Sequence, residues 1–209
     1  MSMDLFLPRT GGAVALALLL GLGGCASLEP AGVESVQTIS ARPYLEQVSL
    51  DGRLSVRYQD NGREEALHGN FSWLQTPERI NLTLFSPLGQ TLAVIEVNRL
   101  GATLTQAGQS ARSASDVDAL VADTLGWPLP VAGLRNWLQG FAIDSAGKDF
   151  VASPQANEVQ TRDGWLIRYA SWQEGRPSDT AMPRRIDLQR STVQAGLVSI
   201  RIVIDAWQS

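Results

Sequence analysis

The chain has 209 residues, a formal net charge of −4 at pH 7 and 18% charged residues. That length is sufficient for one sizeable domain with its own hydrophobic core, and the lack of a Lys/Arg cluster argues against a nucleic-acid partner. The single cysteine and the single histidine exclude a disulfide framework and a Cys/His metal site, so we expect no metal and no cofactor.

The first 24 residues have the pattern of a secretory signal peptide. Arg9 precedes an apolar stretch at 13–20 that is too short to be a permanent membrane-spanning helix. The stretch leads into LGGC at 22–25, which resembles the bacterial lipobox. We therefore expect residues 1–24 to be removed and Cys25 to be acylated. The alternative is an ordinary signal peptide that happens to contain a cysteine.

A tether is expected to follow the lipidated cysteine. Residues 25–40 are polar to small and show no sustained period. Ala26 indicates sorting to the outer membrane, because many Gram-negative lipoproteins kept at the inner membrane carry Asp at this position. Two or three acyl chains would anchor the chain stably, whereas one chain binds only marginally. The folded domain is then 41–209, and it is expected to begin with a short helical stretch at 43–48.

Alternation of apolar and polar residues with a period of two predicts five strands in a meander. An Asp-Asn-Gly turn at 60–62 separates the first two strands. The fourth strand is apolar on both faces, so we expect something to cover it. The five predicted strands are Leu50–Tyr58, Leu67–Gln75, 80–84, Leu92–Val97 and Gly101–Gln106.

The turn between the third and fourth strands carries an unusual leucine. Ser86-Pro87-Leu88-Gly89 has the residue preferences of a type I turn, but its third position usually holds a polar residue. Leu88 occupies that position, and Phe85 comes just before the turn. On this pattern alone, an exposed turn leucine is more often tolerated than functional.

The period changes to that of helices after residue 114. Ser115 and Asp116 form a capping signal, and an apolar face with helical spacing follows from 117 to 125, with Gly126 as its end. A rigid Trp-Pro-Leu-Pro link at 127–130 leads to a second helix. Its apolar stripe is Leu134, Trp137, Leu138 and Phe141.

Strands then resume at Trp165–Tyr169, Arg184–Gln189 and Leu197–Trp207. Antiparallel meanders on both sides of a helical pair predict a mainly β fold with a few helices. We expect a strongly curved sheet or an incomplete barrel, lined by apolar residues and covered by the helices.

Signatures of catalysis are scarce. There is no G-x-S-x-G nucleophile elbow and no phosphate-cradling loop. His68 falls on the polar face of its strand and has no metal-ligating or nucleophilic partner in the sequence. The acids at 64–65 and at 116 and 118 look like a charged turn and a helix start, so paired-acid catalysis is disfavoured. We expect no enzyme and no catalytic residue.

Tryptophan is frequent, with six residues in the chain. Trp73, Trp137, Trp165 and Trp207 come from four separate predicted elements. Pattern alone favours a role as core over a role in lining a ligand cavity.

Several stretches together resemble the LolB family of outer-membrane lipoproteins, which receive other lipoproteins in Gram-negative bacteria. They are the lipobox at Cys25, GNFSWLQ at 69–75, LTLFSPLGQTLAVIEV at 82–97, GWPLPVAGLRNWLQG at 126–140, AMPRRIDL at 181–188 and the closing RIVIDAW. They occur in the same order as in the family and over most of the mature chain, whereas the tether and residues 145–160 match poorly.

The resemblance implies an unclosed, convex antiparallel β-barrel, like those of LolA and LolB, with a helical lid over a hydrophobic cavity that takes acyl chains. It raises the cavity interpretation of the tryptophans above the core interpretation. The candidates for lining the cavity are Trp73, Trp137, Trp165, Trp207, Phe71, Leu82, Leu84 and Leu134.

The resemblance also implies an exposed, membrane-active leucine on a protruding loop. Leu88 is the matching position, and Phe85, Pro87 and Gly89 complete the loop. The implied function is that of a lipid-anchored, periplasm-facing monomer that accepts lipoproteins from the soluble carrier LolA and inserts them into the outer membrane. The implied partners are that carrier, the acyl chains of the cargo and outer-membrane phospholipids.

Two alternatives from other classes remain. The first is a lipid-anchored structural or scaffolding envelope protein whose tryptophans only fill a core. The second, weaker one is a lipid-modifying hydrolase. The soluble carrier itself is disfavoured because a lipid anchor would prevent it from shuttling.

Overall fold

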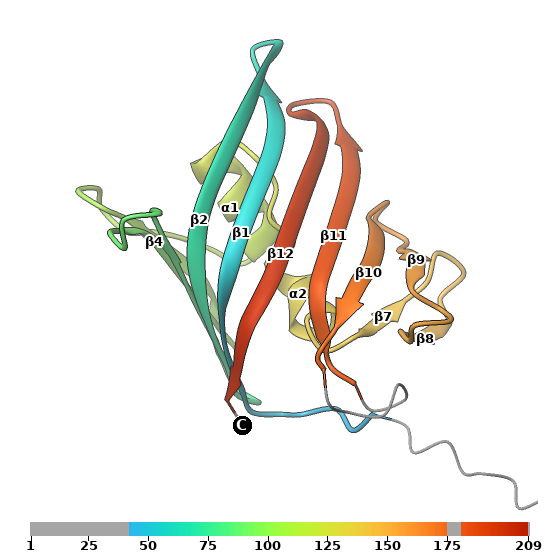
Figure 1. Ribbon diagram of the computed structural model, residues 1–209. Coiled ribbons are helices and arrows are strands. Elements are labelled where there is room, and N and C mark those ends of the chain that lie inside the picture. The colour runs from blue at the N-terminus through green and yellow to red at the C-terminus, as the bar shows by residue number, and fades with distance from the viewer. Residues whose placement is uncertain (1–41, 175–180, 209) are drawn as a thin grey trace, which may run out of the picture. The chain divides into compact units, whose positions relative to one another are not determined.

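The computed structural model describes residues 42–174 and 181–208, so the predicted signal peptide, Cys25 and the tether lie outside the described residues. Ten strands form one antiparallel sheet, and two further strands form a separate hairpin. The first six strands of the large sheet precede the helices in the chain (Figure 1). These are β1 (Val48–Asp60), β2 (Arg63–Gln75), β3 (Ile80–Phe85), β4 (Thr91–Asn98), β5 (Gly101–Gln106) and β6 (Arg112–Ala114).

The remaining strands follow the helices. The separate hairpin comprises β7 (Phe141–Ile143) and β8 (Asp149–Val151), and the large sheet continues with β9 (Glu158–Gln160), β10 (Leu166–Trp172), β11 (Pro183–Thr192) and β12 (Gly196–Gln208). Of these twelve strands, the short ones β6, β7, β8 and β9 have no counterpart in the predicted set.

The strand order of the large sheet is β6-β5-β4-β3-β2-β1-β12-β11-β10-β9. Neighbours in the chain are therefore neighbours in the sheet, except where the first strand pairs with the last. The two edge strands, β6 and β9, do not pair with each other, so the sheet stays open. This arrangement confirms the predicted mainly β, unclosed antiparallel fold.

The alternation of side chains places the core on one face of the sheet. In β12, Val198, Ile200, Ile202 and Ile204 are all buried, as the period of two predicts. Leu50 and Val56 of β1 are buried on the same face, and Val56 is directly opposite Ile200. Arg53 and Arg57 of β1 point to the exposed face. The inner face of the sheet is therefore a continuous apolar wall.

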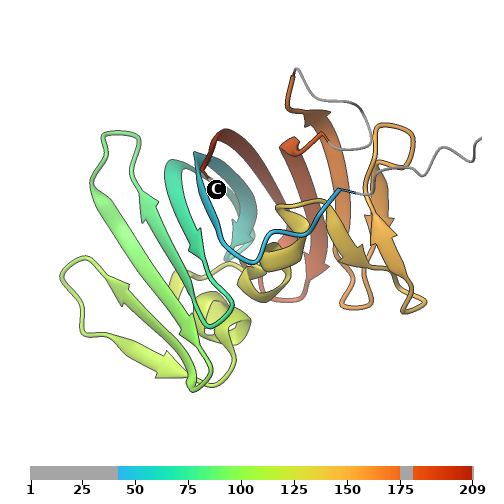
Figure 2. The same ribbon diagram turned by 90° about the horizontal axis from the view of Figure 1, so that it is seen from below.

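Two helices lie inside the curve of the sheet (Figure 2). The first, α1 (Val117–Leu125), begins where the Asp116 side chain accepts a hydrogen bond from the Ala119 N–H at 3.0 Å. It ends at Gly126, whose φ of +80° is the left-handed conformation that favours glycine. Both ends of this helix confirm the prediction.

The second helix differs from the prediction. α2 covers Val131–Trp137, so it begins earlier than the apolar stripe from Leu134 and ends before Phe141. Gly140 adopts a φ of +86°, which breaks the helical path, and Phe141 then begins β7. The helical spacing of Phe141 is coincidental.

The predicted helical stretch at 43–48 is wrong. Residues 42–47 form a strap without regular secondary structure that bends at 46–47, and the first strand begins at Val48. The side chain of Gln139 accepts a hydrogen bond from the Leu45 N–H at 2.8 Å and donates to the Leu45 carbonyl at 3.0 Å. These two bonds satisfy the backbone of Leu45 without the bonds of a helix.

The expectation that something covers β4 holds for one of its two faces. Ala93 and Ile95 are buried on its inner face, but Leu92 on the outer face is 49% exposed. β4 therefore has only one covered face.

Candidate functional site

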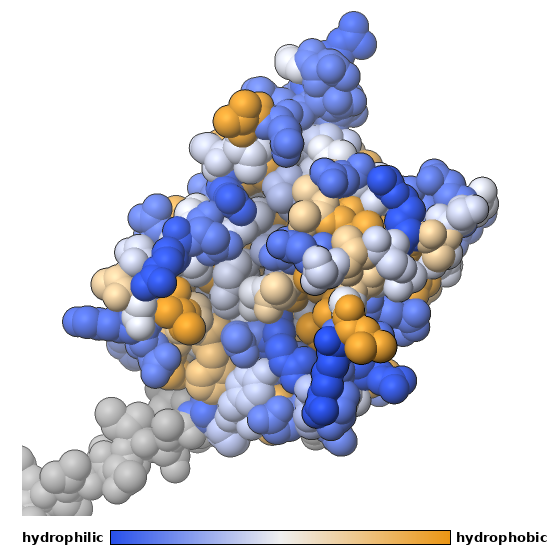
Figure 3. Space-filling model, turned by 180° about the vertical axis from the view of Figure 1, so that it is seen from behind, coloured by the Kyte–Doolittle hydropathy of each residue, from blue (hydrophilic) through white to orange (hydrophobic). Residues whose placement is uncertain are grey.

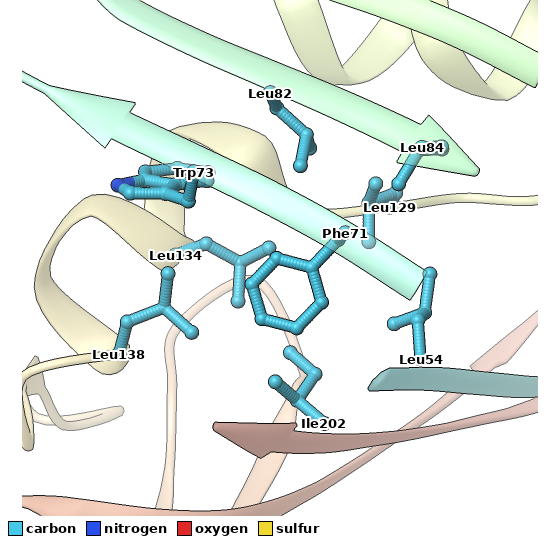
Figure 4. Close-up of a pocket in the computed structure, with 9 residues that line it drawn as sticks. All are labelled: Leu54, Phe71, Trp73, Leu82, Leu84, Leu129, Leu134, Leu138 and Ile202. Atoms are coloured by element: carbon cyan, nitrogen blue, oxygen red, sulfur yellow. The ribbon is translucent and has the colours of Figure 1, made fainter. Parts of the chain in front are cut away.

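An apolar pocket lies between the inner face of the sheet and α2 (Figure 4). Strand β2 contributes Phe71 and Trp73, and β3 contributes Leu84 opposite Phe71 and Leu82 opposite Trp73. Every side chain in the lining is hydrophobic. The lining comprises Leu54, Phe71, Trp73, Leu82, Leu84, Leu129, Leu134, Leu138 and Ile202.

Trp73 is the one tryptophan in this lining, and its indole N–H has a hydrogen-bond partner outside the pocket wall. The Trp73 indole N–H donates to Gln75 Oε1 at 3.3 Å, and the Gln75 Nε2 donates to the Tyr44 hydroxyl at 2.9 Å. The hydrogen-bonding capacity of the indole is thus met, and its ring is left to form apolar wall.

The pocket is nearly filled by its own walls. The room left inside it is about 10 Å³, which is the space that one water molecule requires. An acyl chain does not fit into the space that is left here.

The predicted lining residues fall into two groups. Phe71, Trp73, Leu82, Leu84 and Leu134 lie in the pocket wall.

The other three predicted residues, Trp137, Trp165 and Trp207, lie outside this wall. The rings of Trp137 and Trp165 pack edge to face at 6.4 Å. The indole N–H of Trp207, which is partly buried, donates to the Pro183 carbonyl at 3.4 Å. These three tryptophans thus have packing or hydrogen-bonding partners away from the pocket.

Four residues of the wall were not singled out from the sequence. Leu54 and Ile202 are direct neighbours across the β1–β12 pair, and Leu129 and Leu138 flank α2. The alternation of apolar and polar residues in β1 and β12 could have identified Leu54 and Ile202 as inward-facing. Leu129 could have been identified only from its position in the Trp-Pro-Leu-Pro link between the two helices.

A buried arginine fixes the strap to three separate segments. The Arg42 guanidinium donates to the carbonyls of Ala181 at 3.0 Å, Gln139 at 3.1 Å and Ala152 at 3.0 Å, and its central carbon lies 5.1 Å from the centre of the Trp172 ring. Burial lowers the pKa of Arg42 from its ordinary value. Because Gln139 lies two residues past the last residue of α2, this arginine also holds the end of that helix.

The two helices are linked by a carboxylate. Asp118 of α1 accepts a hydrogen bond from the Ala132 N–H in the first turn of α2 at 3.1 Å. The N-cap residue of α2, Pro130, makes no side-chain hydrogen bond to this turn, so Asp118 satisfies one of its free N–H groups. Burial raises the pKa of Asp118 above its ordinary value of 3.8. The bond ties α1 to the start of α2.

The turn at 86–89 presents its leucine to solvent. The Gly89 N–H donates to the Ser86 carbonyl at 2.9 Å, and Gly89 has a φ of +83°. Leu88 is 89% exposed, whereas Phe85 at the end of β3 is half-buried. Pro87 restricts the backbone on the other side of the leucine. The geometry of the turn therefore holds Leu88 out in solvent.

The surface on the helix side of the sheet carries its hydrophobic residues in separate spots among hydrophilic ones (Figure 3).

Within the described ranges, no three His, Cys, Asp or Glu side chains come together as a metal site would require. No helix in those ranges has both the length and the apolar composition that crossing a bilayer demands.

Comparison with known proteins identifies the family. The sequence profile described as "Outer membrane lipoprotein LolB" matches residues 46–207. This chain belongs to the LolB family. The membership confirms the predicted resemblance, and it agrees with the predicted outer-membrane location.

Individual LolB proteins match over nearly the whole chain. The outer-membrane lipoprotein LolB of Cupriavidus metallidurans is 36% identical over 195 residues, which cover 91% of this chain and 92% of the relative. That of Cupriavidus necator is 38% identical and covers 88% and 89%, and that of Nitrosomonas europaea is 31% identical and covers 92% and 90%. The matched range of 46–207 thus spans the residues of the pocket wall, both helices and the Leu88 turn.

Proposed function

We propose that this LolB-family chain accepts lipoproteins from a LolA-type periplasmic carrier and inserts them into the outer membrane. The observation that carries the proposal is the wholly apolar pocket between the sheet and α2. Such a wall offers hydrocarbon chains burial and no directional chemistry, as a receptor for acyl groups of different cargo proteins requires. The proposal contains no catalytic step and no cofactor.

The energetics of the cargo explain why a protein route is needed. At about 0.8 kcal/mol per CH₂, an acyl chain of about 15 methylenes loses on the order of 10 kcal/mol when it leaves an apolar site for water. A lipoprotein with three chains would therefore not cross the periplasm unprotected. Transfer from carrier to receptor to bilayer keeps the chains out of water, and no nucleotide is needed if each step is downhill.

Leu88 is the proposed point of contact with the bilayer. The loop of Phe85, Pro87, Leu88 and Gly89 exposes one aliphatic side chain almost completely. A side chain of this kind gains free energy when it enters the acyl region of phospholipids. Contact through Leu88 would hold the receptor against the membrane that takes up the cargo.

The anchor at Cys25 keeps the event at the outer membrane. We propose residues 1–24 as the signal peptide, 25–40 as the lipidated tether and 41–209 as the receptor domain, which acts as a monomer facing the periplasm. Mass spectrometry of the mature N-terminus tests acylation directly. Replacing Cys25 should release the chain into the periplasm and leave the pocket intact.

Uptake of a fluorescent fatty acid tests the pocket. The probe is titrated into the mature chain, residues 25–209, carrying Cys25→Ala so that no acyl group competes. Leu84→Trp places a larger side chain in the pocket wall, and Leu92→Trp places it on the exposed face of the next strand. Uptake should fall in the first variant only. No uptake by the parent chain would refute the proposal.

Delivery is tested with a purified carrier loaded with a lipoprotein and with liposomes. The cargo should appear in floated liposomes only when the receptor is present. Cargo that stays on the carrier in the presence of the parent chain would contradict the receptor role.

One observation favours a second candidate function. The pocket is almost filled, as it would be in a lipid-anchored structural protein with an ordinary core. That candidate predicts no uptake of the fatty acid under any condition, so the titration separates the two.

A further inference from the structure

A second hollow lies on the outer face of the large sheet, which is the face turned away from the helices (Figure 1). It measures about 510 Å³, so it is far larger than the space inside the apolar pocket. Side chains of β1, β2 and β9–β12 contribute to its lining. Most of these side chains are polar or charged, so the hollow differs from the pocket in chemistry as well as in size.

Strand pairing brings polar side chains of the hollow together in one row. His68 of β2 lies opposite Ser55 of β1, which lies opposite Arg201 of β12. On the other side of Arg201, Asp187 of β11 and then Arg168 of β10 continue the row. Directly opposed side chains on one face of a sheet lie about 5 Å apart. The register therefore fixes a row of charges across neighbouring strands from β2 to β10.

The hollow carries more positive than negative charge. Its lining contains four arginines and two carboxylates, which are Arg57, Arg168, Arg185, Arg201, Asp187 and Glu158. The whole chain, in contrast, has a formal net charge of −4. The outer face thus offers a local attraction for anions on a chain that is acidic overall.

Two of the four arginines are held by a carboxylate, and two are not. Asp187 accepts a hydrogen bond from Arg185 at 2.7 Å and one from Arg201 at 2.9 Å. Arg57 and Arg168 are exposed, and neither makes an ion pair within the ranges that the structure describes. A guanidinium group presents a planar fork of donors that matches a phosphate. These two groups are therefore available to an anion from outside the chain.

The lining of the hollow favours lipid headgroups over a protein partner. The centres of protein–protein interfaces are rich in aromatic and other apolar side chains. The described lining contains no aromatic side chain, and two of its three aliphatic residues, Leu188 and Ile200, are buried in the core behind it. Phosphate headgroups need only cationic donors at the surface, and the arginines supply them.

A bilayer lies within reach of this face. The chain belongs to a family of outer-membrane lipoproteins, and Cys25 is the proposed site of its lipid anchor. The stretch from Cys25 to Arg42, the first described residue, can span at most about 60 Å. The anchor would therefore keep the folded domain close to the headgroups of the membrane.

We propose that the hollow on the outer face is a docking site for anionic phospholipid headgroups of the outer membrane, and that Arg57 and Arg168 bind their phosphates. Docking by this face turns the helices and the apolar pocket away from the bilayer, toward the periplasm from which a carrier approaches. The inference goes beyond the proposed function, because this docking requires no cargo. It also differs from the contact through Leu88, which is apolar and does not depend on lipid charge.

Flotation with vesicles tests the docking site. The mature chain with Cys25→Ala is mixed with vesicles of phosphatidylcholine alone, or of equal parts phosphatidylcholine and phosphatidylglycerol. The test variant carries Arg57→Gln and Arg168→Gln, which break no ion pair of the described residues. The matched control carries Arg79→Gln and Arg99→Gln. It loses the same charge from two exposed arginines in the β2–β3 and β4–β5 turns, outside the hollow.

The parent chain should bind the anionic vesicles more tightly than the neutral ones, and added salt should weaken this binding. Each arginine at an anionic surface raises the affinity by about fivefold, so the test variant should bind about 25-fold more weakly, and the control should stay within about threefold of the parent. Uptake of the fluorescent fatty acid should be the same in all three chains, which verifies that the fold and the pocket are intact.

Equal binding of the parent to neutral and anionic vesicles, or an equal loss in both double variants, would overturn the docking site. Binding of polyglutamate without a preference for anionic vesicles would assign the hollow to an acidic protein segment, and would overturn it as well. Fatty acid uptake that is absent from the parent would instead refute the proposed function and leave the flotation result unchanged. The two failures are therefore distinguishable.

Discussion

Replacing Leu88 by glutamate should separate delivery to the membrane from binding of cargo. The side chain is 89% exposed, and the turn is closed by the backbone bond between Gly89 and Ser86. The free energy of unfolding should therefore change by no more than about 0.5 kcal/mol. The pocket wall contains no residue of this turn, so fatty acid uptake should also be unchanged.

The expected loss appears only at the bilayer. Burial of a leucine side chain is worth about 1.5–3 kcal/mol, which corresponds to about a 10- to 150-fold difference in occupancy of the inserted state. Leu88→Ala should lose most of this, and Leu88→Glu should lose all of it and add the cost of placing a carboxylate near hydrocarbon. Delivery should fall in that order.

The assay measures cargo in floated liposomes and cargo retained on the receptor, for each variant. Leu100→Glu is the matched control, because Leu100 is 95% exposed in the turn at the opposite end of β4. Normal delivery by Leu88→Glu would refute the reasoning. An equal loss in the Leu100 variant would show that any exposed leucine has the same effect and would refute it as well.

Three further predictions concern buried or half-buried polar groups, each measured by urea unfolding. Arg42→Met should lower the free energy of unfolding by about 3 kcal/mol or more, because it removes the partner of three carbonyls; a change below about 1 kcal/mol would contradict the role of this arginine. Tyr169→Phe should leave stability unchanged or raise it by up to about 1–3 kcal/mol, because the buried Tyr169 hydroxyl has no hydrogen-bond partner among the described residues; a clear loss would show that this hydroxyl is satisfied. Asp118 has a folded pKa raised by burial, so its contribution to stability is lost as pH rises from the ordinary value of 3.8 through the raised pKa. Asp118→Asn should remove this part of the pH dependence, and identical pH profiles would refute it.

The strands were predictable because their period of two has a direct physical cause. Alternate residues of a strand point to opposite faces, so the apolar residues of β1, β2 and β12 could be placed on the inner face from the sequence. The strap and the end of α2 were not predictable in this way. The strap depends on Gln139, which lies 94 positions from Leu45. The stripe that continues to Phe141 has helical spacing, but the helix stops at Trp137.

The same limit applies to the pocket. Alternation identifies the inner face, but it does not tell which part of that face remains unfilled. Phe71 and Trp73 line the pocket, whereas Trp165, on the same inner side, packs against Trp137. Leu129 comes from a proline-rich link with no period at all. Its place in the wall follows from the position of two helices on the sheet, which local sequence does not encode.

The pairing of the first strand with the last affects how the chain can acquire its structure. Leu50 lies opposite Trp207, so β1 can find this partner only after β12 has been synthesised. The strands β1–β6 and β9–β12 are joined by hairpins or short connections, which can form early. The β1–β12 pair must wait, because its residues are far apart in the sequence. During synthesis, β1 is left with one unpaired edge until β12 has emerged. A nascent chain of this kind exposes a long aggregation-prone edge and would benefit from a chaperone until β12 has paired with β1.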